Sequence, residues 1–144
     1  MNWFIALIIG TIVFAANAHA EEDLVPNPKL TPGKVAKRDK DKRGVTAAIE
    51  QKVFARYRLP WSRRAEFKID HLIPVELEGA DTIDNLWPQS VRAKPYGADR
   101  KELLTEVLLQ RIAKGQITLE EAQKQISKDW IDAFIDHLGM VYLK

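Results

Sequence analysis

The chain contains no cysteine among its 144 residues. This absence excludes a thiol nucleophile and any zinc site with cysteine ligands. The seven glycines are scattered, so the sequence has no glycine-rich phosphate-binding loop. Three candidate nucleophiles, Ser62, Ser90 and Ser127, lie outside any nucleophile-elbow pattern, which disfavours a serine hydrolase.

Histidine is also rare, with three residues in the chain. His19 lies in an apolar N-terminal segment, and His137 lies near the end of a helical pattern, where the helix dipole favours a basic residue. His71 follows a short strand pattern and stands directly after an acid, Asp70. An isolated Asp-His pair is often structural, but at a strand end the two side chains could hold a cation and activate a water.

Residues 1–20 differ in composition from the rest of the chain. They are apolar, carry no Lys, Arg, Asp or Glu, and end in the small-x-small cleavage pattern Ala18-His19-Ala20. The apolar run is shorter than the roughly 20 residues of a spanning helix. We expect a signal peptide that is cleaved near Ala20, export to the periplasm or the medium, and no stable membrane insertion afterwards. The alternative is a retained anchor.

Positive charge is concentrated in one part of the chain. Residues 29–68 hold 13 Lys and Arg against 4 Asp and Glu, whereas residues 69–144 hold 9 against 13. A basic half of this kind suits a polyanion such as nucleic acid, although a solvated, charge-rich surface is the simpler explanation.

The mature chain is predicted to form an N-terminal arm, residues 21–44, and one domain, residues 45–144. Three prolines and two glycines interrupt the arm, and its residues 37–43 form a basic run. The run could contact phosphates or serve as a flexible lead-in. The oligomeric state does not follow from the sequence.

The domain pattern predicts an α+β fold. Apolar residues recur every four positions over residues 45–59, which predicts a helix with Thr46 as its cap and Pro60 after its end. Residues 66–70 alternate polar and apolar side chains, and residues 83–87 form a second short strand that Pro88 should end.

Two helices are predicted after the strands. The first begins at Asp99 or the residue before it and continues through Ala113, with Gly115 ending it. The second opens on the capping box from Thr118 to Glu121 and continues to Leu138, with Gly139 closing it.

The order strand, loop, strand, loop, helix in residues 66–114 resembles the H-N-H endonuclease superfamily, the ββα-metal or His-Me finger fold. Four segments carry the resemblance: Asp70-His71-Leu72-Ile73-Pro74, Glu76-Leu77-Glu78-Gly79-Ala80, Asn85-Leu86-Trp87-Pro88-Gln89 and Lys101-Glu102. They are similar to a group of small exported H-N-H-type proteins. The resemblance implies a small ββα-metal core with additional helices before and after it.

The resemblance also implies roles for single residues. His71 matches the general base that takes a proton from the attacking water, and Asp70 matches the carboxylate that binds the metal. Asn85 matches the asparagine that holds the loop and orients His71. The implied cofactor is a divalent metal, Mg²⁺ first, with Mn²⁺ or Zn²⁺ as alternatives.

The chain departs from the superfamily pattern at two places. The helix carries no His or Asn as second metal ligand. Glu102 and Asp99 are the available oxygen donors, and Glu102 is the candidate, although an acid in a first helical turn is also favoured by the helix dipole. Glu78 stands where the related pattern has a glycine.

The function expected from these residues is hydrolysis of phosphodiester bonds in DNA, in preference to RNA, by an exported metal-dependent nuclease. Arg63, Arg64, Lys68 and Lys101 are the candidate nucleic-acid contacts. Two alternatives remain open: a catalytically inactive periplasmic binding protein on the same scaffold, and a structural exported domain. Glu76 and Glu78 could also be read as a glycosidase pair, but close carboxylates in a turn are usually only solvated.

Overall fold

The computed structural model describes residues 25–140. The expected signal peptide and its cleavage point lie outside these residues. None of the helices within them is long and apolar enough to cross a membrane.

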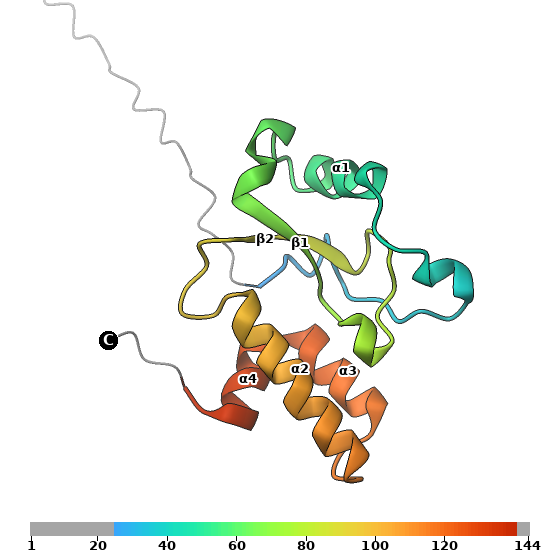
Figure 1. Cartoon of the computed structure of the whole chain (residues 1–144), viewed down its shortest axis with the longest axis vertical. Coiled ribbons are helices and arrows are strands. Elements are labelled where there is room, and N and C mark those ends of the chain that lie inside the picture. The colour runs from blue at the N-terminus through green and yellow to red at the C-terminus, as the bar shows by residue number, and fades with distance from the viewer. Residues whose placement is uncertain (1–24, 141–144) are drawn as a thin grey trace, which may run out of the picture.

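The fold is α+β, with a two-stranded antiparallel sheet between helices (Figure 1). Strand β1 pairs with β2 in a register that runs from Phe67 opposite Ser90 to His71 opposite Leu86. Helix α1 lies on one side of the sheet, and α2, α3 and α4 form a layer on the other side. The elements in order are η1 (Asp39–Lys42), α1 (Ala47–Arg56), η2 (Trp61–Glu66), β1 (Phe67–His71), η3 (Val75–Leu77), β2 (Leu86–Ser90), α2 (Ala98–Ala113), α3 (Leu119–Lys128) and α4 (Trp130–Leu138).

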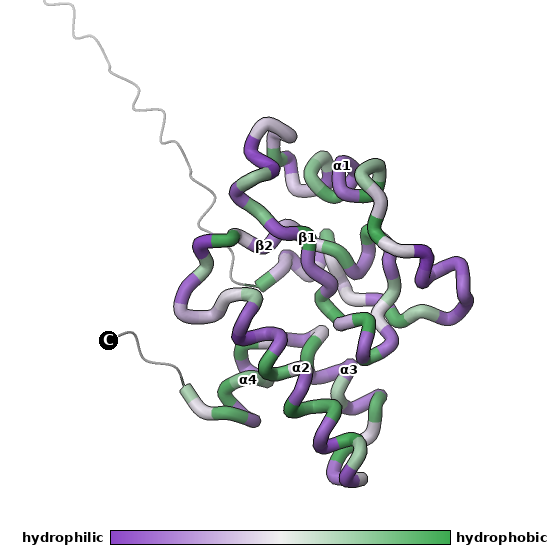
Figure 2. Tube along the Cα trace, in the orientation of Figure 1, coloured by the Kyte–Doolittle hydropathy of each residue, from purple (hydrophilic) through white to green (hydrophobic). Residues whose placement is uncertain are grey.

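The main core lies between the segment that joins β1 to β2 and the three C-terminal helices. Apolar residues from η3, β2 and all three helices meet there, and both Trp87 and Trp130 are fully buried. Figure 2 shows apolar stretches alternating with hydrophilic ones along these helices, as expected where each helix buries one face. On the other side, Phe54 of α1 packs edge-on against Phe67 and Trp61, at 5.9 and 5.1 Å between ring centroids.

The two predicted helix caps are confirmed. The Thr46 side chain accepts a hydrogen bond from the Ile49 N–H, and the box between Thr118 and Glu121 is formed in both directions. Each cap could be predicted from the sequence, because its side chain accepts a hydrogen bond from an N–H group only a few residues further along the chain.

Two boundary predictions were wrong. Pro88 does not end the second strand but lies inside β2, opposite Ile69; a proline is tolerated in an edge strand, where its missing N–H can face away from the partner. The predicted single C-terminal helix is two helices. Asp129 adopts an extended conformation and caps α4 through bonds from the Ile131 and Asp132 N–H groups.

The described part of the arm packs against the domain. Thr31 is fully buried, and its hydroxyl bonds to the Tyr57 hydroxyl and the Leu86 carbonyl. Val35 forms a bridge with Gly79. Residues 25–36 are therefore part of the fold, while η1 forms a hydrophilic projection from it (Figure 2).

Candidate functional site

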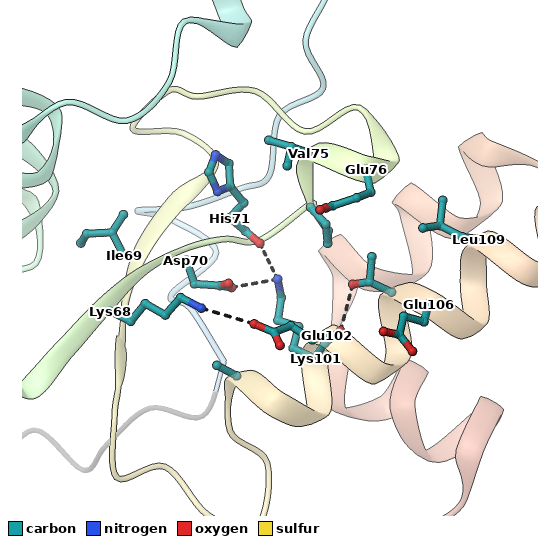
Figure 3. Close-up of a pocket in the computed structure, with 13 residues that line it drawn as sticks. Lys68, Ile69, Asp70, His71, Val75, Glu76, Lys101, Glu102, Glu106 and Leu109 are labelled. Carbon is teal, nitrogen blue, oxygen red and sulfur yellow. Dashed lines mark hydrogen bonds and ion pairs between the residues drawn. The ribbon is translucent and has the colours of Figure 1, made fainter.

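The end of β1 directs two neighbouring side chains to opposite faces of the sheet. Successive residues of a strand alternate, and Asp70 lies on the α2 side, where its carboxylate meets Lys101. His71 belongs to the opposite face, and Figure 3 shows its imidazole pointing away from the Asp70 carboxylate. The structure therefore brings His71 and Asp70 to one strand end without directing both side chains at one point.

The His71 imidazole is held by an acid from the following loop. Its Nε2 lies 2.7 Å from Asp81 Oδ1, and the Asp81 side chain is 8% exposed. Because an ionised carboxylate only accepts, the hydrogen is on Nε2 and Nδ1 keeps its lone pair. The His71 side chain is 21% exposed, so water can reach it. A histidine with one nitrogen held by a carboxylate and the other free is arranged as a general base.

Asp81 also ties the basic run of the arm to His71. Its Oδ2 accepts a hydrogen bond from the Gly44 N–H at 2.7 Å, and its own N–H donates to the Asp41 carbonyl at 2.7 Å. The run in residues 37–43 therefore ends beside the carboxylate that holds the imidazole. Lys37, Lys40 and Arg43 of this run are exposed, and none of them forms an ion pair within residues 25–140.

Asn85 fixes the loop that follows His71. Its side chain is fully buried, its Oδ1 accepts from the Ile73 and Lys34 N–H groups, and its Nδ2 donates to the Ile73 and Ala80 carbonyls. Asn85 makes no hydrogen bond to His71. Its positioning effect is indirect, because it fixes the loop that carries Asp81.

Asp70 is engaged by a buried cation. Lys101, in the first turns of α2, is 3% exposed, and its Nζ lies 2.8 Å from Asp70 Oδ2. The same ammonium donates to the His71 carbonyl oxygen, and the Trp87 indole donates to Asp70 Oδ2 at 3.0 Å. Lys101 is thus an internal ion-pair partner and not a surface contact for phosphate.

A pocket of about 350 Å³ lies between β1, η3 and α2 (Figure 3). Its ionisable lining is mainly acidic: Asp70, Glu76, Glu102 and Glu106, with Lys68, His71 and Lys101. Glu102 pairs with Lys68 at 3.3 Å, and its side chain is 71% exposed. Within residues 25–140, Glu76 and Glu106 have no ionic partner, so the pocket carries an excess of negative charge.

The predicted metal ligands do not fit a divalent ion as they are arranged. The Lys101 ammonium binds Asp70 Oδ2, and the Glu102 carboxylate is directed to Lys68. No group of three His, Asp or Glu side chains within the described residues could hold a metal ion. A metal at Asp70 would have to share this carboxylate with a cation that already binds it.

The other predicted nucleic-acid contacts already have partners. Arg63 makes a two-pronged bond to Glu66, at 3.0 and 2.6 Å, and this bond holds the pKa of Glu66 below its usual value. Arg64 lies 5.8 Å over the Trp61 ring, and Lys68 pairs with Glu102. Lys37, Lys40 and Arg43 of the arm, by contrast, form no ion pair in the part of the chain that the structure describes.

Sequence reasoning missed Asp81 as a site residue, and it assigned Lys101 to phosphate instead of to Asp70. No sequence pattern pointed to Asp81, because it meets His71 from ten positions away along the chain. Lys101 offered a signal: a cation in a first helical turn opposes the helix dipole and therefore needs an acid partner. Asp70 is that partner.

Comparison of the chain with protein-family models, with curated proteins and with solved structures finds no match.

Proposed function

We propose that this chain binds nucleic acid and hydrolyses a phosphodiester bond, with His71 as the general base. The observation that carries the proposal is the arrangement around Asp81, which holds His71 through one oxygen and the end of the basic run through the other. The run that ends at this contact carries three cations without an ion-pair partner among the described residues, and a nuclease needs both a base and phosphate-binding cations.

The chemical step uses the free nitrogen of the imidazole. His71 Nδ1 takes a proton from a water whose oxygen attacks phosphorus. The bond from phosphorus to the leaving oxygen breaks, and that oxygen takes a proton from solvent. Asp81 stabilises the imidazolium formed in this step, because the Nε2–H bond to its carboxylate strengthens as the ring becomes charged.

The cations of the arm supply the binding contribution. Lys37, Lys40 and Arg43 are exposed and can approach phosphates on either side of the scissile bond. Such contacts are independent of base sequence and weaken with salt. Cleavage is therefore expected at many sequences, in DNA as the first substrate and RNA as the second.

The decisive experiment is nicking of supercoiled plasmid by residues 21–144, with and without Mg²⁺ and with a chelator. His71→Ala should lower the rate by at least about 100-fold, since general-base catalysis contributes about 100- to 10,000-fold. The matched control is His137→Ala, which removes a histidine on α4 and should cut like the natural chain. Equal rates for His71→Ala and the natural chain would rule out His71 as the base.

A second candidate is nucleic-acid binding without cleavage. The excess of acid in the pocket and the engagement of Asp70 by Lys101 favour it, because both disfavour a phosphate and a metal on the α2 side of the strand. Salt-sensitive binding by a chain that cuts neither DNA nor RNA under any of these conditions would establish this alternative.

A further inference from the structure

The contacts of Lys101 are those of a cation held in a site. Its side chain is almost fully buried, and its Nζ meets two oxygen atoms, Asp70 Oδ2 and the backbone carbonyl of His71. Figure 3 shows the ammonium between these two oxygens, with the stem of the lysine rising from α2. The indole of Trp87 donates to the same Asp70 oxygen and holds the carboxylate in place.

The oxygens that hold this ammonium are also hard ligands of the kind that Mg²⁺ and Mn²⁺ prefer. The Asp70 side chain is 17% exposed and the ammonium that binds it is almost fully buried. A divalent ion on the same carboxylate oxygen would lie close to this ammonium, and the two positive charges would repel each other. A metal at Asp70 therefore requires that the Lys101 ammonium move away. The displaced ammonium would then need new oxygen partners, because a buried charge without a partner is costly.

The neighbouring carboxylates do not provide enough further ligands to favour a metal over the ammonium at Asp70. Glu102 is turned to Lys68 and is mostly exposed, while Glu76 and Glu106 line the pocket without ionic partners. Exposed carboxylates of this kind hold a divalent ion only weakly unless several converge, and no three converge among the described residues.

We infer that Lys101 is the resident cation at Asp70, in the place that a divalent metal would take, and that its ammonium keeps a metal from this carboxylate in the natural chain. The inference rests on the proposed function and adds one detail to the site. The positive charge at the end of β1 comes from the Lys101 ammonium and not from a bound metal. Nucleic-acid cleavage by the natural chain should accordingly persist in a chelator.

The test is metal binding, which is measured without any cleavage. Mn²⁺ affinity is determined by calorimetric titration for residues 21–144 and for Lys101→Gln, whose amide can still donate to Asp70 and to the His71 carbonyl. We expect Lys101→Gln to bind Mn²⁺ at least about tenfold more tightly. Adding Asp70→Asn to this variant should abolish the gain.

The matched control is Lys68→Gln, which removes the other cation of the same pocket and leaves the pair between Lys101 and Asp70 intact. A general effect of pocket charge would tighten Mn²⁺ binding equally in both variants and would overturn the inference. A local readout is the indole N–H resonance of Trp87, assigned with Trp87→Phe. Saturating Mg²⁺ should shift it in Lys101→Gln and leave it in place in the natural chain.

Two further results would overturn the inference: a shift of the Trp87 resonance by Mg²⁺ in the natural chain, or no gain in Mn²⁺ affinity in Lys101→Gln. Lys101→Met serves as a second variant, since its apolar side chain preserves the packing of the lysine stem. The Trp87 resonance in the natural chain still tests whether Mg²⁺ reaches Asp70 if both variants unfold. Loss of the proposed function is recognised separately, by a chain that shows the expected metal competition and cuts no nucleic acid.

Discussion

His71 and Asp81 form a close pair across the loop that joins the two strands, with Nε2 2.7 Å from Oδ1. This contact selects the tautomer with hydrogen on Nε2 and leaves Nδ1 free to accept a proton. Asp81→Asn should lower phosphodiester cleavage by about 10- to 1,000-fold, because the amide cannot stabilise the imidazolium. The tautomer is read from nitrogen-15 shifts of the His71 ring. A ring that stays protonated on Nε2, with full activity, in Asp81→Asn would remove Asp81 from the mechanism.

The basic run of the arm should set the salt dependence of binding. Replacing Lys37, Lys40 and Arg43 with serine removes three exposed cations that form no ion pair among the described residues. Each lost phosphate contact reduces the slope of log affinity against log salt by about 0.9 on duplex DNA. Fluorescence anisotropy at several salt concentrations measures this slope. Lys114→Ser with Lys124→Ser, on the distant helical layer, is the control pair and should change it far less.

Asn85 should be critical for stability. Asn85→Ala leaves the Ile73 N–H and the Ile73 and Ala80 carbonyls without their side-chain partner in a buried place. The expected loss is at least about 3 kcal/mol in the free energy of unfolding, since each of these three buried groups costs about 1–3 kcal/mol when it is left unpaired. Urea denaturation measures it. The same change at the exposed Asn27, whose side chain accepts only from the Lys29 N–H, should cost under about 1 kcal/mol.

Glu78 occupies a backbone conformation that favours glycine, with φ of 64° at the end of η3. Glu78→Gly should therefore raise the free energy of unfolding by about 0.5–1 kcal/mol, because it relieves the left-handed strain and loses only an exposed pair with Lys42. Glu76→Gly, two residues earlier, should lower it. A destabilised Glu78→Gly variant would show that the pair with Lys42 outweighs the strain.

The residue after Glu78 should tolerate no side chain. A Cβ at Gly79 would collide with the Ile73 carbonyl and would lie 2.9 Å from Asn85 Nδ2. Gly79→Ala should consequently disrupt the same loop that Asn85 holds, and it should lower the free energy of unfolding by more than about 2 kcal/mol. Thermal unfolding measures this change, and a melting temperature equal to that of the natural chain would show that the loop can move away.

His137 should make folding less favourable in acid. Burial in the helical layer is the main cause that lowers its pKa below 6.5, the positive charge of Arg111 adds to it, and Asp136 opposes it. The unfolded chain therefore takes up the proton first, and stability falls as the pH drops below about 6.5 towards the folded-state pKa. His137→Gln should flatten this part of the curve of unfolding free energy against pH. If the curve for His137→Gln matched that of the natural chain, the burial of His137 would not be the cause of the pH dependence.

Local features of the fold could be predicted from the sequence. The caps at Thr46 and Thr118 depend on side chains that meet N–H groups two or three residues away. The helix before Gly115 and the β1 pattern likewise follow from short-range periodicity. The break at Asp129 was hidden, because the apolar spacing on either side of it continues almost in phase and only the extended backbone of one residue separates α3 from α4.

The sequence by itself determined the α+β class and the nearness of His71 to the end of a strand, since these depend on the order of residues along a few turns or strand positions. Only the tertiary structure decided which partners the site residues have. Asp81 reaches His71 across a loop, and Lys101 reaches Asp70 across 31 positions of chain. Ionic partners are selected by distance and burial in space, which no local pattern encodes.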